Sequence, residues 1–167
     1  MRKQSVAAIV KALNDESVRY LIAGGLAVVA HGHVRFTADV DLIVALDPDN
    51  ARRAMKALSS LGYRPRAPVP IDSFADPDVR SAWIRDKGLT VFSLHSPQHP
   101  ATEVDLFVRM PVDFDAAHRS ALRLAVAPGL TAPFLGYDDL VTTKTIAGRP
   151  QDLADLERLR AIRDECP

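Results

Sequence analysis

Two consecutive glycines end a short apolar run in the N-terminal part of the chain. The run covers residues 20–23, and Gly24-Gly25 separates it from an apolar segment at residues 26–31. A run of this length that stops at glycine is typical of a buried strand, and the glycines allow a tight entry into a helix. A second apolar run, at residues 40–46, ends at Asp47-Pro48 and predicts another buried strand. The order of strand, helix and strand indicates the α/β class.

The remaining segments mix helices and strands without strict alternation. Apolar residues at helical spacing predict helices at residues 5–13, 49–61, 78–86 and 115–120. Apolar runs predict strands at residues 89–94, 103–108 and 122–126, and four prolines between residues 65 and 77 exclude a long element there. From about residue 137 the chain is predicted to be helical, with a break before Pro150. We therefore predict an α/β fold with a mixed sheet, flanked by helices mainly on one face. It forms a single domain over residues 1–167, with a short helical extension at its C-terminal end.

Composition limits the function classes that fit the chain. It has 167 residues, with 21 Lys+Arg against 21 Asp+Glu and therefore no net charge. This balance excludes nucleic-acid binding by bulk charge, but it leaves open a local basic face from Arg52, Arg53, Arg64 and Arg66. No apolar run approaches the 18 residues that a membrane span needs. The single cysteine, Cys166, provides no disulfide framework and fits a cytoplasmic location.

Two aspartates precede the second apolar run at alternate positions. Asp39 and Asp41 share one face of the predicted strand, where two negative charges repel unless a cation lies between them or one takes up a proton. Mg²⁺ or Mn²⁺ is the natural partner, because hard divalent ions prefer oxygen ligands. Asp105, in a separate predicted strand, is the candidate third carboxylate, and Glu103 on the same face is the alternative.

The glycine pair supplies the complementary feature. The backbone N–H groups of Gly24 and Gly25 can approach an anion closely, so this turn is a candidate phosphate site. Phosphate and metal sites on consecutive elements are the minimal equipment for phosphoryl or nucleotidyl transfer. Each signal also has an ordinary interpretation: a glycine pair forms a tight turn, an Asp-x-Asp lies on a solvated edge, and an inward carboxylate such as Asp105 protects a sheet edge. The combination favours the functional interpretation.

These residues resemble the signature of the DNA polymerase β-like nucleotidyltransferase superfamily. The N-terminal part of the resemblance consists of Ala23-Gly24-Gly25, His31-Gly32, Arg35, Thr37 and Asp39-Val40-Asp41-Leu42. The C-terminal part consists of Lys144, Arg149, Asp152 and Asp155, and it resembles the small bacterial branch that includes AbiEii-type toxins and minimal nucleotidyltransferases. The resemblance extends from about residue 20 to residue 159, with a poorly matched middle.

The resemblance implies a role for each matched residue. Gly24 and Gly25 would hold the triphosphate of an NTP, and Arg35 and Thr37 would contact its oxygens. Asp39, Asp41 and Asp105 would ligate Mg²⁺ or Mn²⁺, and Asp105 would also help to deprotonate the acceptor hydroxyl. Lys144 would neutralise phosphate charge, and Asp152 or Asp155 would position either Lys144 or the acceptor. If Lys144 lies on an open rim, we expect Lys144→Ala to weaken NTP binding and leave stability nearly unchanged.

The implied activity is Mg²⁺-dependent transfer of an NMP from an NTP to an acceptor hydroxyl. The toxin-like C-terminal motif favours RNA, such as a tRNA 3′ end, and a protein hydroxyl or a small antibiotic remains open. It also implies a component of a toxin–antitoxin system with a cognate partner protein. The alternative from a different class is a catalytically silent member of the fold that acts as a binding or antitoxin-like regulatory module.

Overall fold

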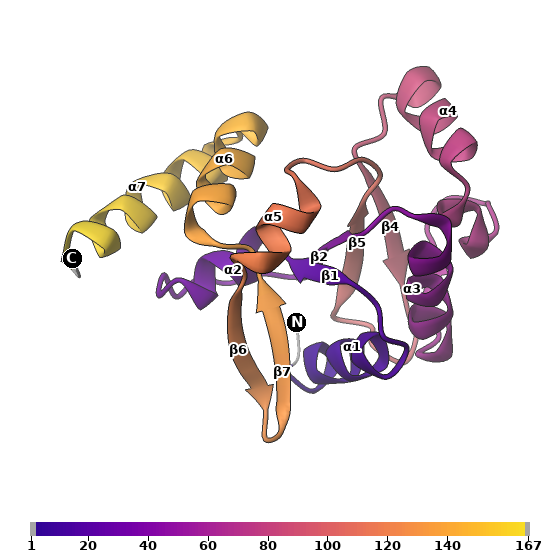
Figure 1. The fold of residues 1–167 in the computed structure, drawn as a ribbon, viewed down its shortest axis with the longest axis horizontal. Helices are drawn as coiled ribbons and strands as arrows, with labels where there is room; N and C mark the ends of the chain where they lie inside the picture. Colours follow the sequence, from indigo (N-terminus) through magenta and orange to yellow (C-terminus); the bar gives the residue numbers. More distant parts are fainter. Residues whose placement is uncertain (1–2, 166–167) are drawn as a thin grey trace.

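A computed structural model describes residues 3–165 of the chain, so Cys166 lies outside the described residues. This part of the chain forms one seven-stranded mixed sheet with helices on both faces (Figure 1). The strands are β1 (Tyr20–Ile22), β2 (Asp39–Val44), β3 (Arg64–Pro65), β4 (Val91–His95), β5 (Glu103–Phe107), β6 (Leu122–Ala127) and β7 (Leu130–Phe134). The helices are α1 (Lys3–Asp15), α2 (Gly24–Ala30), α3 (Pro48–Ser60), α4 (Pro77–Lys87), α5 (Phe114–Arg119), α6 (Tyr137–Ala147) and α7 (Pro150–Glu165), and a short 3₁₀ helix, η1, covers Ile71–Ala75.

The centre of the sheet is built from strands that are far apart in the sequence. The strand order is β3-β4-β5-β2-β1-β7-β6. β2 pairs antiparallel with β1 on one side and parallel with β5 on the other. β1 in turn pairs in parallel with β7. β2 is therefore flanked on both sides, and its first residues, Asp39 and Asp41, lie in the middle of the sheet rather than at an edge.

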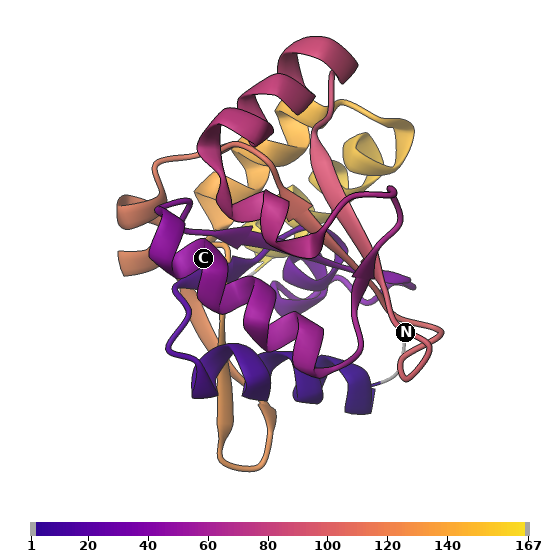
Figure 2. The ribbon, with the colours of Figure 1, turned by 90° about the vertical axis from the view of Figure 1, so that its right-hand side faces the viewer.

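The first face of the sheet carries the larger apolar core. Val40, Leu42 and Val44 alternate along β2 and are fully buried on this face, as the period of a strand requires. Apolar side chains of α1 and α3, such as Ile9 and Met55, pack against them. Figure 2 shows α1 and α3 side by side across this face. The burial of this core fixes the register of β2, and so it turns the intervening aspartates to the opposite face.

The second face is covered over only part of the sheet. A smaller core there joins Leu21 and Ile43 of the central strands to Phe114 of α5, Leu140 of α6 and Leu159 of α7. Helices therefore lie on both faces, and the sequence-based prediction that they lie mainly on one face was wrong. Asp39, Asp41 and Asp105 are only partly buried on this second face, beside the smaller core.

Most predicted elements are confirmed within a few residues. Both strands around the glycine pair are present, and β2 begins at Asp39, so the two aspartates belong to the strand itself. The prolines between residues 65 and 77 leave only β3 and η1 in that segment. β7 was not predicted, and α2 begins at Gly24 rather than after the glycine pair. No helix among residues 3–165 is both long and apolar enough to cross a membrane.

Candidate active site

The carboxylates on β2 and β5 face each other across one pair of parallel strands. The register places the Cα of Asp41 opposite that of Asp105, and the Cα of Asp39 opposite that of Glu103. Because paired residues of neighbouring strands point to the same face, all four carboxylates lie on the second face of the sheet. The two strands that the sequence predicted to carry the candidate metal ligands are thus direct neighbours.

The negative charge of this group is not fully compensated within the chain. Burial, and then the neighbouring Asp105 and Asp39, together raise the pKa of Asp41 to about 6, against the opposing effect of Lys144 and Arg149. The pKa of Asp39 is also raised, first by burial and then by Asp105 and Glu103. A carboxylate group with raised pKa values in a partly open site is typical of a functional site that binds a cation.

Gly24 lies directly against the Asp41 carboxylate. Its φ is +56°, in the left-handed region that favours glycine, and a Cβ added there would lie 1.8 Å from Asp41 Oδ2. Any side chain at position 24 would therefore displace a candidate metal ligand. The backbone of the glycine turn and the carboxylates of β2 thus form one compact site.

Gly25 brings a second pair of predicted residues to the same place. A Cβ added to Gly25 would lie 2.6 Å from Thr37 Oγ1 and 2.9 Å from Arg35 Nη2. Arg35, Thr37 and Asp39 are each half-buried, whereas the alternating Val34 and Phe36 are 85% and 81% exposed. One side of this segment therefore carries Arg35 and Thr37 against the glycine turn, so the four predicted phosphate-binding residues lie together.

The C-terminal motif forms a buried ion-pair network. Lys144 Nζ lies 2.7 Å from Asp152 Oδ1 and 2.8 Å from Asp155 Oδ2, and all three side chains are at most 5% exposed. Arg149 Nε lies 2.7 Å from Asp152 Oδ2, and Arg35 Nε lies 2.9 Å from Asp155 Oδ1. The network therefore joins α6 and α7 to the Arg35 segment beside the glycine pair.

The placement of Lys144 differs from the open rim considered above. Its ammonium group is enclosed by carboxylates, although it remains close enough to Asp41 to lower the pKa of that residue. The Arg35–Asp155 bridge spans most of the chain and has no local sequence signal, so sequence reasoning did not find it. The functional roles of Lys144, of this bridge and of the other candidate site residues stay predictions.

The two histidines near the β4–β5 turn are more buried than a turn of this composition suggests. Pro97 and Pro100 by themselves predict an exposed turn around His95 and His99. Both are half-buried: His95 ends β4, and His99 stacks on Tyr63 with ring centroids 5.7 Å apart. The prolines indicated a turn correctly, but the long-range contact with Tyr63 has no local signature.

The donor atoms of the carboxylates and the positions of their backbones suit the binding of a hard divalent cation. Their donors are anionic oxygens, which Mg²⁺ prefers. Within residues 3–165, no three Asp, Glu, His or Cys side chains converge closely enough to hold a metal ion as they stand. At least one carboxylate would have to turn toward the others. The backbone register allows this, because Asp41 and Asp105 are direct neighbours on one face.

The sheet and its helices form a nucleotidyltransferase-like fold. A solved structure with this fold is that of the antibiotic-resistance nucleotidyltransferase ANT(2'')-Ia, determined in solution. The two chains are 13% identical, with a TM-score of 0.59 over 98% of this chain and 89% of that one. No protein-family model matches the sequence, and no curated protein is similar to it in sequence. The structural comparison shows the fold alone.

Proposed function

We propose that this protein transfers a nucleoside monophosphate from an NTP to an acceptor hydroxyl. The observation that carries the proposal is the parallel register of β2 and β5, which aligns Asp41 with Asp105 while Gly24 lies against Asp41. A phosphate-sized anion at the glycine turn would then lie beside a group of carboxylates suited to a divalent cation. This combination is what nucleotidyl transfer requires.

Donor binding is assigned to one side of the carboxylates. Gly24 and Gly25 offer backbone N–H groups, and Arg35 and Thr37 lie against Gly25. The triphosphate would be held there, and Asp39, Asp41 and Asp105 would hold Mg²⁺ or Mn²⁺. When bound, the cation neutralises charge on the phosphate oxygens. Lys144 contributes through its positive field rather than by direct contact, because its ammonium group is enclosed by Asp152 and Asp155.

The reaction exchanges one P–O bond for another. The acceptor oxygen attacks the α-phosphorus, and its proton passes to Asp105. The bond from the α-phosphorus to the bridging oxygen of the β-phosphate breaks, and pyrophosphate leaves with that electron pair. Attacking and leaving oxygens lie in line in such a transfer, so positioning and charge neutralisation supply most of the rate.

The proposal also concerns the class of acceptor and the biological role of the protein. The C-terminal motif resembles AbiEii-type toxins, which favours RNA as the acceptor and a toxin–antitoxin role with a cognate partner. The fold neighbour ANT(2'')-Ia is an antibiotic-resistance factor, which favours a small molecule. A protein hydroxyl is the third class, and labelling of total RNA, total protein and small molecules with radioactive NTPs separates the three.

Calorimetry with each NTP in the presence of Mg²⁺ tests the proposal directly. We expect one NTP to bind in a metal-dependent manner, and Asp41→Asn to abolish the metal dependence. Asp49→Asn is the matched control, because Asp49 lies on α3 in an exposed pair with Arg52. If the wild-type protein binds no NTP with Mg²⁺, the catalytically silent binding module is the correct function.

A further inference from the structure

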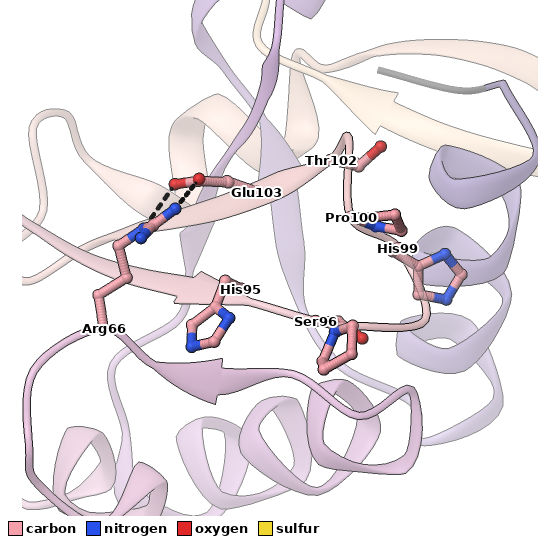
Figure 3. Close-up of a pocket in the computed structure, with 8 residues that line it drawn as sticks. Arg66, His95, Ser96, His99, Pro100, Thr102 and Glu103 are labelled. Carbon is pink, nitrogen blue, oxygen red and sulfur yellow. Dashed lines mark hydrogen bonds and ion pairs between the residues drawn. The ribbon is translucent and has the colours of Figure 1, made fainter.

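A small cavity opens beside the carboxylates, on the side away from the glycine turn. It has a volume of about 190 Å³, and its lining includes Arg66, His95, Ser96 and Glu103 (Figure 3). Glu103 lies two residues before Asp105 on β5, and its Cα pairs with that of Asp39. The cavity therefore begins where the candidate metal-binding face ends.

The strand order fixes the position of the cavity relative to the donor. The glycine turn follows β1, whereas His95 lies at the end of β4, and the strands between them are β2 and β5. The carboxylates thus lie between the glycine turn and the cavity. In-line transfer requires the acceptor oxygen and the leaving pyrophosphate on opposite sides of the α-phosphorus. If the triphosphate lies at the glycine turn, the acceptor approaches from the cavity.

The lining suits hydrogen bonds to a small polar molecule. Arg66 forms a two-point ion pair with Glu103, with 2.9 Å between Arg66 Nε and Glu103 Oε2. This ion pair holds the Glu103 side chain in place, so the cavity wall presents a carboxylate that accepts hydrogen bonds. His95, at the end of β4, also lines the cavity, and Figure 3 shows its imidazole ring there. A carboxylate, a guanidinium and an imidazole together match a ligand that offers several hydroxyl groups.

Size and charge argue against a polynucleotide in this cavity. Drug-sized ligands occupy pockets of roughly 300–1,000 Å³, so this cavity accommodates about one ring of a ligand. Arg66 is neutralised by Glu103, and Arg52 is paired with Asp49, so two of the four arginines of the candidate basic face are already compensated. The nearby Asp39 and Asp105 add negative charge. A polyanion gains no net attraction here, whereas a cationic molecule is attracted and a neutral one is not repelled.

We propose that this cavity is the acceptor subsite and that it takes one ring of a small, hydroxyl-rich molecule that is neutral or cationic. The inference rests on the proposed nucleotidyl transfer and names its acceptor class. Arg66, His95 and Glu103 bind the acceptor and place its reacting hydroxyl near Asp105. They do not contact the NTP, so their substitution affects acceptor binding and leaves donor binding intact.

The test compares donor binding with acceptor use in the same variants. Mg²⁺-dependent NTP binding is measured by calorimetry, and pyrophosphate release is measured with myo-inositol, glucose, glucosamine or total RNA as acceptor. We expect at least one of the three small molecules to stimulate release. In Arg66→Gln and His95→Ala, the KM for that acceptor should rise about tenfold or more, with NTP affinity within about twofold of the wild type. Arg85→Gln, which removes an exposed arginine from a surface ion pair with Asp86, should leave both unchanged.

The outcomes distinguish failure of the proposed function from failure of the proposed acceptor subsite. If the wild-type protein binds no NTP with Mg²⁺, the proposed function fails, and the subsite fails with it. If NTP binds but RNA is the substrate that is labelled, or none of the small molecules stimulates release, the acceptor subsite is overturned while the proposed function stands. Unchanged KM values in both cavity variants would overturn it in the same way.

Discussion

The Asp41 carboxyl group is held in surroundings that favour its protonated form. It lies against the backbone of Gly24, opposite Asp105 and two residues from Asp39. Burial and these two carboxylates raise its pKa to about 6 from an ordinary value of 3.8. A group placed in this way lowers the stability of the folded protein so that the site can attract a cation.

Asp41→Asn should therefore stabilise the metal-free protein above neutral pH. The folded state binds the Asp41 proton more tightly than the unfolded state, so wild-type stability falls as pH rises from about 4 to about 6. Asparagine has the same shape and no such titration. In urea denaturation with a chelator present, we expect the variant to be more stable by on the order of 1–3 kcal/mol at pH 7.5, and equal to the wild type near pH 4.

Asp49→Asn is again the matched control, because its side chain is exposed on α3. It should change the free energy of unfolding by less than about 1 kcal/mol at both pH values. A wild-type protein that is more stable than Asp41→Asn at pH 7.5 would contradict the charge repulsion inferred for the site.

Lys144→Ala should destabilise the protein, in contrast to the expectation for a lysine on an open rim. Lys144 is 4% exposed and bridges Asp152 and Asp155. Without its ammonium group, the two carboxylates have only Arg149, Arg35 and neighbouring polar groups as partners. Uncompensated buried carboxylates are costly, so we expect a loss of about 3 kcal/mol in the free energy of unfolding by urea denaturation.

Lys56→Ala provides the comparison for this substitution. Lys56 pairs with Glu16 on the surface of α3, and its removal should cost less than about 1 kcal/mol. Equal stabilities of the two alanine variants would show that the buried network contributes nothing to folding.

At the level of elements, α7 contacts the segment that precedes β2. Asp155 of α7 pairs with Arg35, and a Cβ on Gly32 would lie 3.7 Å from Ile162 of the same helix. The segment from residue 31 to residue 38 has no regular secondary structure of its own, so these contacts with α7 restrain it.

Asp155→Asn should loosen this segment without unfolding the sheet. Loss of the charge weakens the bridge to Arg35, so amide hydrogen exchange in peptides covering residues 31–38 should become at least about tenfold faster. Peptides from β4 and β5 should keep their protection. Asp164→Asn, at an exposed position further along α7, is the control and should leave exchange unchanged. Unaltered protection of residues 31–38 in Asp155→Asn would mean that α7 does not restrain them.

The strands show how much of the fold the sequence predicts. β1, β2 and β5 were predicted because their apolar runs are short and bounded by turn residues. β7 was missed because Pro133 lies within it, and proline argues against a strand that has two neighbours. The structure accommodates Pro133 because β7 shares register with β1 only at Phe134, so at position 133 it pairs with β6 alone.

Only part of the candidate site could be predicted from the sequence. The glycine pair and the carboxylates at positions 39, 41 and 105 stand within predicted elements, and the pairing of β2 with β5 places Asp41 opposite Asp105. The Arg35–Asp155 bridge and the cavity beside Glu103 depend on packing between distant segments. Long-range side-chain contacts of this kind have no periodic or local signal in a single sequence.

For the molecule as a whole, one sheet supports two apolar cores. The larger core includes Trp83, which stacks on Phe92 with ring centroids 5.0 Å apart. The smaller core, on the opposite face, includes Leu140 and Leu159 of the C-terminal helices. Because β1 and β2 contribute side chains to both cores, loss of either one should destabilise the other.

We therefore expect the whole chain to unfold in one transition, as a single domain should. Trp83 is the only tryptophan, so its fluorescence reports on the larger core, whereas far-UV circular dichroism reports on all helices. Leu159→Ala, in the smaller core, should lower both denaturation midpoints equally, with a cost of about 2–5 kcal/mol. If the helical signal is lost before the Trp83 signal, the C-terminal helices fold as a separate unit.

The pairing of β2 with β5 also determines when during its synthesis the protein can assemble the candidate site. The strand that carries Asp39 and Asp41 leaves the ribosome long before its partner with Asp105, and α7, which supplies Asp155, follows later still. A nascent chain that holds only the glycine turn and the first two carboxylates lacks both Asp105 and the restraint on Arg35. We therefore expect the proposed nucleotide binding to appear only after residue 155 has emerged.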